Sequence, residues 1–233
     1  MLADALGHDV RIGRRFLNAG LGFGGGCLPK DIRTLIHCST ELGAMKAAAL
    51  LQQVDEINMS QRLQVIDLAI EPCGGSVLNR RIGILGTAFK SLTDDVRDSP
   101  APNVAAALHL RSAKVIVYDP QATATAQRMF RTLTYADSLT YADSLEEVAA
   151  GADATLVLIE WDEFRASDPI AFDAMIESRV IIDERNCPDA TAWRAAGWSF
   201  TELGASSSRS PVIDGVREAL TRRTAQLVGS PGG

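Results

Sequence analysis

Residues 81–119 read RIGILGTAFKSLTDDVRDSPAPNVAAALHLRSAKVIVYD. This stretch opens with an apolar run at 81–86, passes through an alanine-rich segment at 100–110 that favours a helix, and closes with a second apolar run at 114–119. A strand, a helical crossover and a second strand predict a parallel unit. Further apolar runs continue the alternation at 153–159, 179–183 and 198–202. We therefore expect residues 77–204 to form an α/β domain with a doubly wound, Rossmann-like parallel sheet.

The carboxyl ends of these strands are where such a sheet binds ligands. They carry Phe89-Lys90, Asp119, Trp161 and Asp183-Glu184-Arg185. The turn after the first run keeps only two glycines of a dinucleotide fingerprint, and Phe89 and Lys90 fill the rest of it. We therefore predict a nucleotide site without the tight pyrophosphate turn of an NAD domain, which argues against an unrelated Rossmann reductase that binds NAD at Gly83–Gly86.

Residues 41–71 contain no proline and repeat apolar residues at helical spacing. They predict one long helix, ended by Pro72 and the Gly74-Gly75 pair. A helix of about 30 residues spans about 45 Å, so we expect it to connect two lobes or to pack against a second subunit. The predicted organisation is a helical central segment at 1–76, the sheet domain at 77–204 and a tail at 205–233 with an amphipathic stretch at 212–227. A tandem TYADSL repeat at 134–145 is interpreted as a loop-lengthening duplication.

Composition excludes several classes of protein. The 233 residues are 46% hydrophobic and 22% charged with a net charge of −6, which is typical of a soluble globular protein and unfavourable for nucleic acid binding. No apolar run approaches the roughly 18 residues of a membrane span, and the first residues do not resemble a secretory signal. The four cysteines lack the spacing of a metal site or a disulfide framework. We expect no membrane partner, no metal and a cytoplasmic location.

A glycine-dense loop at 19–27 ends in Cys27. Glycines let a backbone approach a ligand closely, and Pro29 favours the start of a helix, where a thiolate is stabilised. Lys30 and Asp31 add a cation and an acid/base group within one turn. From the residues alone, a nucleophile and a small buried side chain both remain open for Cys27. The other three cysteines lack comparable surroundings and are interpreted as structural.

Four motifs, in order along the chain, carry a resemblance to a known family. They are Arg11-Ile12-Gly13 with Phe16 to Asp31, Phe89-Lys90-x-x-Thr93-Asp94-Asp95-x-Arg97-Asp98-Ser99-Pro100, Glu160 to Arg165, and Asp183 to Asn186. Residues 3–204 resemble the UDP-glucose/GDP-mannose dehydrogenases. The run from Phe16 to Gly25 is more similar to the UDP-glucose branch than to the GDP-mannose or N-acetylmannosamine branches.

The resemblance implies a mechanism. Family members oxidise C6 of a nucleotide sugar in two hydride transfers to NAD, by way of a thiohemiacetal and a thioester on a cysteine that water then hydrolyses. Cys27 is the nucleophile by this resemblance, Asp31 orients or deprotonates the water, and Lys30 contributes charge. The implied NAD contacts are Cys27, Leu28, Pro29, Lys30 and Arg97.

The resemblance also implies substrate contacts. The loop from Phe16 to Gly24 wraps the sugar and phosphates, and Arg11 reaches into the site of a dimer partner. Phe89 and Lys90 hold the nucleotide end, and Arg185 binds the UDP portion. The implied substrate-binding residues are Arg11, Phe16, Leu17, Asn18, Ala19, Gly20, Leu21, Gly22, Phe23, Gly24, Phe89, Lys90 and Arg185.

Two departures and one missing part qualify these expectations. Gly26 stands where the family commonly has serine, and Glu184 stands where it usually has glycine, which we expect to place a negative charge near the diphosphate. The family's N-terminal NAD-binding domain precedes the first motif and is not found in these 233 residues. We therefore expect the chain alone to be inactive or nearly so.

Several readings of the chain stay open: a truncated or split enzyme with a separately encoded N-terminal domain, a non-catalytic UDP-sugar-binding fragment, or a member acting on another nucleotide sugar such as GDP-mannose. A homodimer through the long helix is expected in each.

Overall fold

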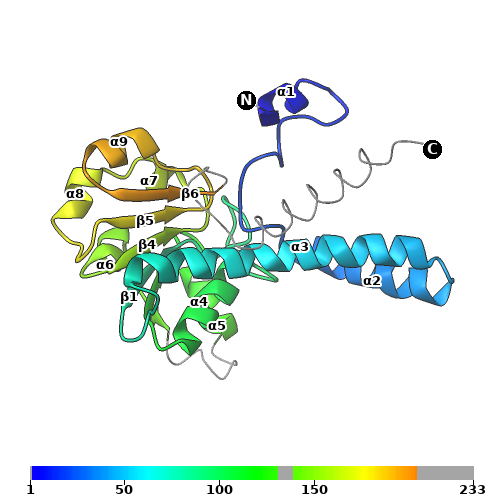
Figure 1. Ribbon diagram of the computed structural model, residues 1–233, viewed down its shortest axis with the longest axis horizontal. Coiled ribbons are helices and arrows are strands. Elements are labelled where there is room, and N and C mark those ends of the chain that lie inside the picture. Colours follow the sequence, from blue (N-terminus) through cyan, green and yellow to red (C-terminus); the bar gives the residue numbers. More distant parts are fainter. Residues whose placement is uncertain (1, 131–138, 204–233) are drawn as a thin grey trace, which may run out of the picture. The chain divides into compact units, whose positions relative to one another are not determined.

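The computed structural model describes residues 2–130 and 139–203, all within one unit that ends at Leu203. Within these residues six strands form one sheet in the order β3-β2-β1-β4-β5-β6. Figure 1 labels β1, β4, β5 and β6 of this sheet. Every neighbouring pair is parallel, which confirms the predicted doubly wound α/β fold. The strands are β1 (Arg81–Leu85), β2 (Lys114–Tyr118), β3 (Thr140–Tyr141), β4 (Ala154–Val157), β5 (Val180–Asp183) and β6 (Ser199–Glu202).

Each face of the sheet is covered by its own helices. Alternate residues of β1 show why: Ile82 and Ile84 join one buried cluster with α3 (Met45–Ile70) and α4 (Pro100–Leu110). Leu85 joins a second cluster, to which the short helices of the opposite face contribute. Those helices are α6 (Leu145–Ala149), α7 (Asp162–Arg165), α8 (Pro169–Asp173) and α9 (Ala190–Ala195). A smaller cluster holds α5 (Thr123–Phe130) through Ala126.

A close contact at Gly83 fixes α6 on the sheet. A Cβ built at Gly83 would lie 2.7 Å from Val148 Cγ1, so no larger residue fits there without a shift. The glycine that resembled part of a dinucleotide fingerprint therefore serves helix–sheet packing.

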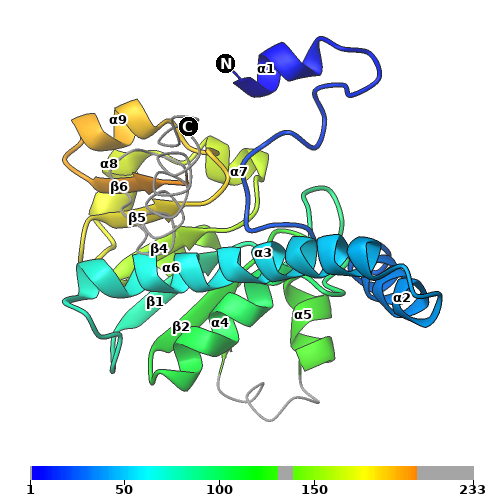
Figure 2. The ribbon, with the colours of Figure 1, turned by 45° about the vertical axis from the view of Figure 1, so that its right-hand side comes forward.

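The helical segment is a hairpin of two antiparallel helices, α2 (Leu28–Glu41) and α3, as Figure 2 also shows. The predicted single helix over 41–71 is corrected at its start, whereas its end at Pro72 and the Gly74-Gly75 pair is confirmed. Gly43 has φ +71° and closes α2, so α3 begins only at Met45. Pro72 lies in a short 3₁₀ turn, η1 (Glu71–Cys73), after which Gly74 and Gly75 also have positive φ.

The two halves of α3 have different surroundings. Val65, Ile66 and Ala69 near its end are buried in the sheet core. Apolar residues nearer its start, such as Leu50 and Ile57, are exposed. A 26-residue helix is roughly 39 Å long, so its first half extends away from the sheet.

Several short elements were not predicted, and two segments considered in the sequence analysis lie outside the described residues. The strand β3 was not predicted because two residues are too short for a periodic pattern, and it comes from the second copy of the TYADSL repeat. A first helix, α1 (Leu2–Gly7), was also not predicted. The first copy of the repeat up to Ser138 and the tail from residue 205 lie outside the described residues. In the part that is described, no helix combines the length and apolar character of a membrane span.

Candidate functional site

Cys27 is exposed and stands immediately before the first residue of α2. Pro29 lies buried in the first turn of this helix, and the N–H of Asp31 donates to the carbonyl of Cys27 at 2.9 Å. Lys30 Nζ lies 3.9 Å from Asp31 Oδ1 with both side chains exposed. The expected start of a helix at this point is confirmed, and its partial positive charge lies beside the thiol.

The glycine loop before Cys27 packs against three segments that are distant in sequence. A Cβ built at Gly20 would lie 2.5 Å from Nη1 of Arg185, and one at Gly25 would lie 3.0 Å from the ring of Phe89. At Gly26 the nearest atom is the guanidinium carbon of Arg97, at 3.0 Å. The structure therefore brings together the cysteine loop and three of the residues implied by resemblance. It also gives these glycines a packing reason besides ligand approach.

Two arginines beside the loop are already paired with carboxylates. Nε of Arg185 donates to the carbonyl of Leu158 at 2.9 Å and lies 3.3 Å from Glu160 Oε2, and the side chain is only 11% exposed. The more exposed Arg97 donates hydrogen bonds from Nε and Nη2 to the carboxylate of Asp95. This pairing lowers the pKa of Asp95 below its ordinary value. A diphosphate at this surface therefore competes with Asp95 and Glu160 for the guanidinium donors.

A neutral side chain that the sequence analysis did not single out holds the same loop. Asn58 of α3 bonds to the N–H and to the carbonyl of Phe23. Its only sequence signal is a polar residue within the apolar run of the long helix, and nothing in the pattern points to Phe23. The backbone groups of Phe23 are thus engaged inside the protein, as is the N–H of Gly25, which donates to Arg97. A ligand must use other amides of the loop.

The earlier half of the first motif, residues 11–18, makes its side-chain hydrogen bonds within the N-terminal segment. Arg11 pairs with Asp9 and its side chain is 85% exposed, while Asn18 accepts a hydrogen bond from Arg14. Phe16 is fully exposed and has φ +67°. Leu21, in contrast, is fully buried in the core with α3 and α4, so it offers no exposed surface to a ligand.

The turn after β1 is filled by a carboxylate of the protein itself. Asp119 is 2% exposed, and its Oδ2 accepts the N–H groups of Thr87 at 2.7 Å and Ala88 at 3.1 Å. Its Oδ1 accepts those of Gln121 and Ala122. In a dinucleotide domain these turn amides face a pyrophosphate. A buried acid in that place does not fit a pyrophosphate, so the sheet domain is a poor main site for NAD.

Comparison with known proteins identifies the lineage. Residues 1–60 match the central domain of the UDP-glucose/GDP-mannose dehydrogenase family, and residues 83–190 match its UDP binding domain. The chain belongs to this family. The first match contains the glycine loop, and the second contains the residues that pack against it, Phe89, Arg97 and Arg185.

Curated relatives of the family agree. The chain is 34% identical over 208 residues to UDP-glucose 6-dehydrogenase TuaD of Bacillus subtilis, covering 89% of this chain and 43% of that protein. It is 42% identical over 182 residues to UDP-glucose 6-dehydrogenase AglM of Haloferax volcanii, covering 78% of this chain and 40% of that protein. The chain thus spans less than half the length of these relatives.

Solved structures share the fold. A UDP-glucose dehydrogenase from Pyrobaculum islandicum superposes with a TM-score of 0.70 at 31% identity, over 86% of this chain and 42% of that one. A GDP-mannose dehydrogenase from Pseudomonas aeruginosa gives a TM-score of 0.64 at 20% identity, over 86% and 44% respectively, which supports the fold alone.

The departure from the family pattern at Glu184 has a different consequence from the one expected. Its side chain is fully buried, and neither carboxyl oxygen has a hydrogen-bond partner among the described residues. Burial, together with the neighbouring Asp183, raises the pKa of Glu184 to about 8. The Glu184 carboxyl does not face solvent, and its raised pKa favours the protonated form at neutral pH. The expectation that Glu184 places a negative charge near a diphosphate is therefore wrong.

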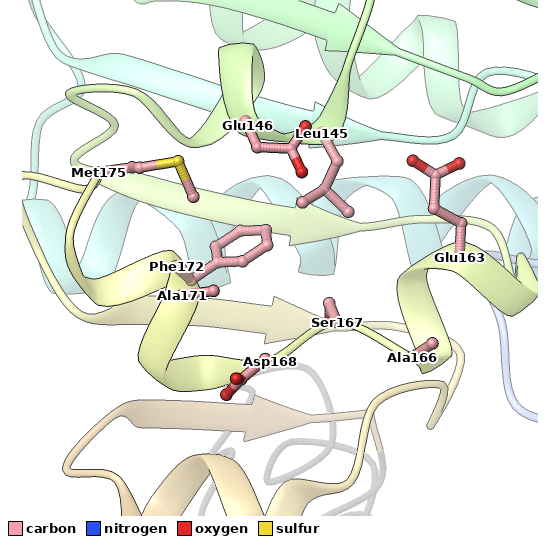
Figure 3. Close-up of a pocket in the computed structure, with 9 residues that line it drawn as sticks. All are labelled: Leu145, Glu146, Glu163, Ala166, Ser167, Asp168, Ala171, Phe172 and Met175. Carbon is pink, nitrogen blue, oxygen red and sulfur yellow. The ribbon is translucent and has the colours of Figure 1, made fainter.

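A hollow of about 230 Å³ lies elsewhere, between α6, α7 and α8 (Figure 3). Phe172 and Leu145 project toward it, and Glu146, Glu163 and Asp168 supply carboxylates at its rim. Glu163 belongs to one of the four family motifs, but the hollow contains none of the substrate or NAD contacts that the resemblance implies, and carboxylates repel a nucleotide diphosphate. The candidate site of this family member is therefore the glycine loop and not this hollow.

Proposed function

We propose that this chain carries the nucleophile and the nucleotide-sugar site of an NAD-dependent dehydrogenase that oxidises UDP-glucose to UDP-glucuronate. The observation that supports this most is the position of Cys27. Its thiol is exposed at the start of α2, directly after a loop that packs on Phe89, Arg97 and Arg185.

The nucleotide sugar binds along the glycine loop. Arg185 supplies guanidinium donors to the UDP portion, and Phe89 and Lys90 hold its nucleotide end. Lys90 Nζ lies 5.5 Å from the centre of the Phe89 ring, so a cation and an aromatic face are presented together. The sugar then lies toward Cys27. The chain's similarity to UDP-glucose 6-dehydrogenases supports glucose as the sugar.

The chemistry of the chain's own residues is covalent capture. The Cys27 sulfur adds to the C6 aldehyde of the oxidised sugar and forms a thiohemiacetal. Loss of a hydride from C6 and of the proton of its hydroxyl group gives the thioester, and attack of water releases the carboxylate and regenerates the thiol. Asp31 lies one helical turn from Cys27 and accepts a proton from that water.

NAD supplies the hydride acceptor when it is bound. The exposed edge formed by Cys27, Leu28, Lys30 and Arg97 fits contact with an anionic cofactor, and Pro29 fixes the backbone there. The turn after β1 does not fit its pyrophosphate because Asp119 fills it. The main contacts to NAD therefore come from outside the residues described.

A homodimer through the helical hairpin completes the proposal. Leu35, Leu50, Ile57 and Leu63 of α2 and α3 are each more than half exposed, and burying such apolar surface favours association.

All four cysteines are free thiols, which agrees with a reducing compartment such as the cytoplasm.

The test is protection of Cys27 by substrate. The chain is treated with iodoacetamide with and without UDP-glucose, and alkylation of each cysteine is followed by peptide mass spectrometry. We expect UDP-glucose to slow alkylation of Cys27 at least about fivefold while Cys38, exposed on the same helix, reacts at an unchanged rate.

Equal rates at Cys27 with and without UDP-glucose contradict the proposal. Stronger protection by GDP-mannose than by UDP-glucose assigns the site to another nucleotide sugar. A parallel assay of NADH formation separates catalysis from binding, since protection without turnover describes a binding fragment.

A further inference from the structure

The middle of the long helix α3 carries a buried polar residue, Asn58, whose side chain is 5% exposed. Asn58 Oδ1 accepts the N–H of Phe23 at 2.7 Å, and Asn58 Nδ2 donates to the carbonyl of Phe23 at 3.1 Å. One side chain thus satisfies both backbone hydrogen-bonding groups of a single loop residue. A neighbouring strand does the same in an antiparallel sheet, and the paired geometry fixes the orientation of the backbone as well as its position.

Gly22, the residue before Phe23, leaves room for the side chain of Asn58. Gly22 has φ +98°, a conformation that other residues rarely adopt. A Cβ built at Gly22 would also overlap Asn58 Oδ1. The backbone angle and the space around it therefore both favour glycine, and the space is limited by Asn58.

The residues after Phe23 are held from a second direction. A Cβ at Gly24 would lie 2.5 Å from the carbonyl oxygen of Asp98, and the N–H of Gly25 donates to the carbonyl of Arg97 at 3.1 Å. The loop is thus fixed between α3 on one side and the segment around Arg97 on the other. Asn58 supplies the hydrogen bonds from α3.

Chain connectivity links this clamp to the thiol. Cys27 follows Phe23 by four residues and leads directly into α2, which packs along α3. The segment from Phe23 through Cys27 to α2 therefore contacts α3 at both of its ends, at Asn58 and along α2. Only three residues, all of them glycine, separate Phe23 from Cys27, so a shift of the Phe23 backbone changes the position of Cys27.

We propose that Asn58 is a positioning residue that sets the conformation of the substrate loop, Gly20–Cys27, by occupying both backbone groups of Phe23. Its role in substrate binding rests on the proposed function of that loop, whereas its control of the loop conformation does not. By this assignment Asn58 also determines which amides the loop presents to a nucleotide sugar, because those of Phe23 are withdrawn from the ligand.

The experiment uses three variants of the full chain. Asn58→Leu removes both hydrogen bonds at similar volume. Asn58→Asp keeps the acceptor for the N–H of Phe23 and offers a donor to its carbonyl only when protonated. Gln53→Leu is the matched control on the same helix, because Gln53 is exposed and bonds only to Glu56 among the described residues.

Hydrogen exchange of the peptide covering residues 20–27 is the first readout. We expect Asn58→Leu to speed its exchange about tenfold relative to peptides of α4, and Gln53→Leu to leave it unchanged. In Asn58→Asp, protection should return as the pH is lowered from 8 to 5, after correction for intrinsic exchange. A residue that only fills space gives no such pH profile.

Affinity for UDP by calorimetry is the second readout, with an expected loss of about tenfold in Asn58→Leu. Unchanged loop exchange in Asn58→Leu, or an Asn58→Asp variant without pH dependence, overturns the proposal. If the wild-type chain does not bind UDP, the proposed function fails while the exchange measurements still decide the role of Asn58. If Asn58→Leu does not fold, Asn58→Asp carries the test.

Discussion

Two glycine-bearing turns of the molecule, the one after β1 and the loop before Cys27, are held by opposite chemistry. The turn after β1, at Gly86–Ala88, wraps a buried carboxylate, Asp119. The substrate loop is held by the neutral amide of Asn58 and lies beside the guanidinium groups of Arg97 and Arg185. Both turns direct backbone toward a polar partner, but only the second lies in a setting that is attractive to an anion.

The difference shows how a Rossmann-like sheet can lose a phosphate site and keep its fold. An internal acid that accepts the turn amides gives them the negative partner that a ligand would otherwise supply. The turn is then a structural part of the core, and by the proposed function a nucleotide is recognised at a loop outside the sheet. Mutations at the two turns should therefore have different consequences, the first in stability and the second in loop geometry.

The largest expected effect is at the sheet turn. Asp119→Ala leaves four backbone N–H groups without their acceptor, and we expect a loss of about 4 kcal/mol in the free energy of unfolding by urea. Asp189→Ala is the matched control, because Asp189 also accepts two backbone N–H groups but caps the exposed helix α9. Its loss should be about 1 kcal/mol. Equal losses for the two variants would mean that Asp119 is not the support of the turn.

A second buried acid tests what happens when the partners are missing. Glu184 has a pKa raised from 4.5 to about 8, so the folded protein holds its proton over a range in which the unfolded chain has lost it. Stability therefore falls as the pH rises from about 4.5 to 8 and is flat above. We expect Glu184→Gln to be about 3 kcal/mol more stable than wild type at pH 8.5 and nearly equal at pH 4.5, as measured by urea unfolding.

Asp183 helps to separate this effect, since burial raises its own pKa to about 6. Both proteins keep the pH dependence that Asp183 causes below pH 6, and only the wild type should lose stability between pH 6 and pH 8. A wild-type protein whose stability is constant over that upper interval would contradict a protonated, unpartnered Glu184.

The smallest expected effects distinguish two glycines of the substrate loop. Gly24→Ala places a Cβ against the carbonyl oxygen of Asp98 and the ring of Pro100, neither of which can move freely, so we expect a loss of about 2 kcal/mol. Gly26→Ala meets only the exposed guanidinium group of Arg97, which can rotate away, and should cost less than about 1 kcal/mol. Urea unfolding of both variants measures the difference, and the reverse order would show that the contact with Asp98 is not a constraint.

Apart from β3, the strands could be predicted, as could the helices α3 and α4, because each lies in a run of four or more residues with a recognisable apolar pattern or ends at a strong breaker. The helices of the opposite face were not, since α6 to α9 have four to six residues and little periodicity. At the site, motif order placed Cys27, Phe89, Arg97 and Arg185 in one family pattern. It could not reveal Asn58, whose partner Phe23 lies 35 residues away. The strand pattern placed Asp119 at the ligand edge of the sheet but could not show that it accepts N–H groups 31 and 32 residues earlier.

The helix α3 anchors two parts of the protein at once. Val65 near its end lies in the sheet core, and Asn58 two turns earlier faces the substrate loop. Each added residue turns a helix by about 100°, so an insertion or deletion between these two positions would face one of them the wrong way. During evolution this stretch should accept substitutions while keeping its length.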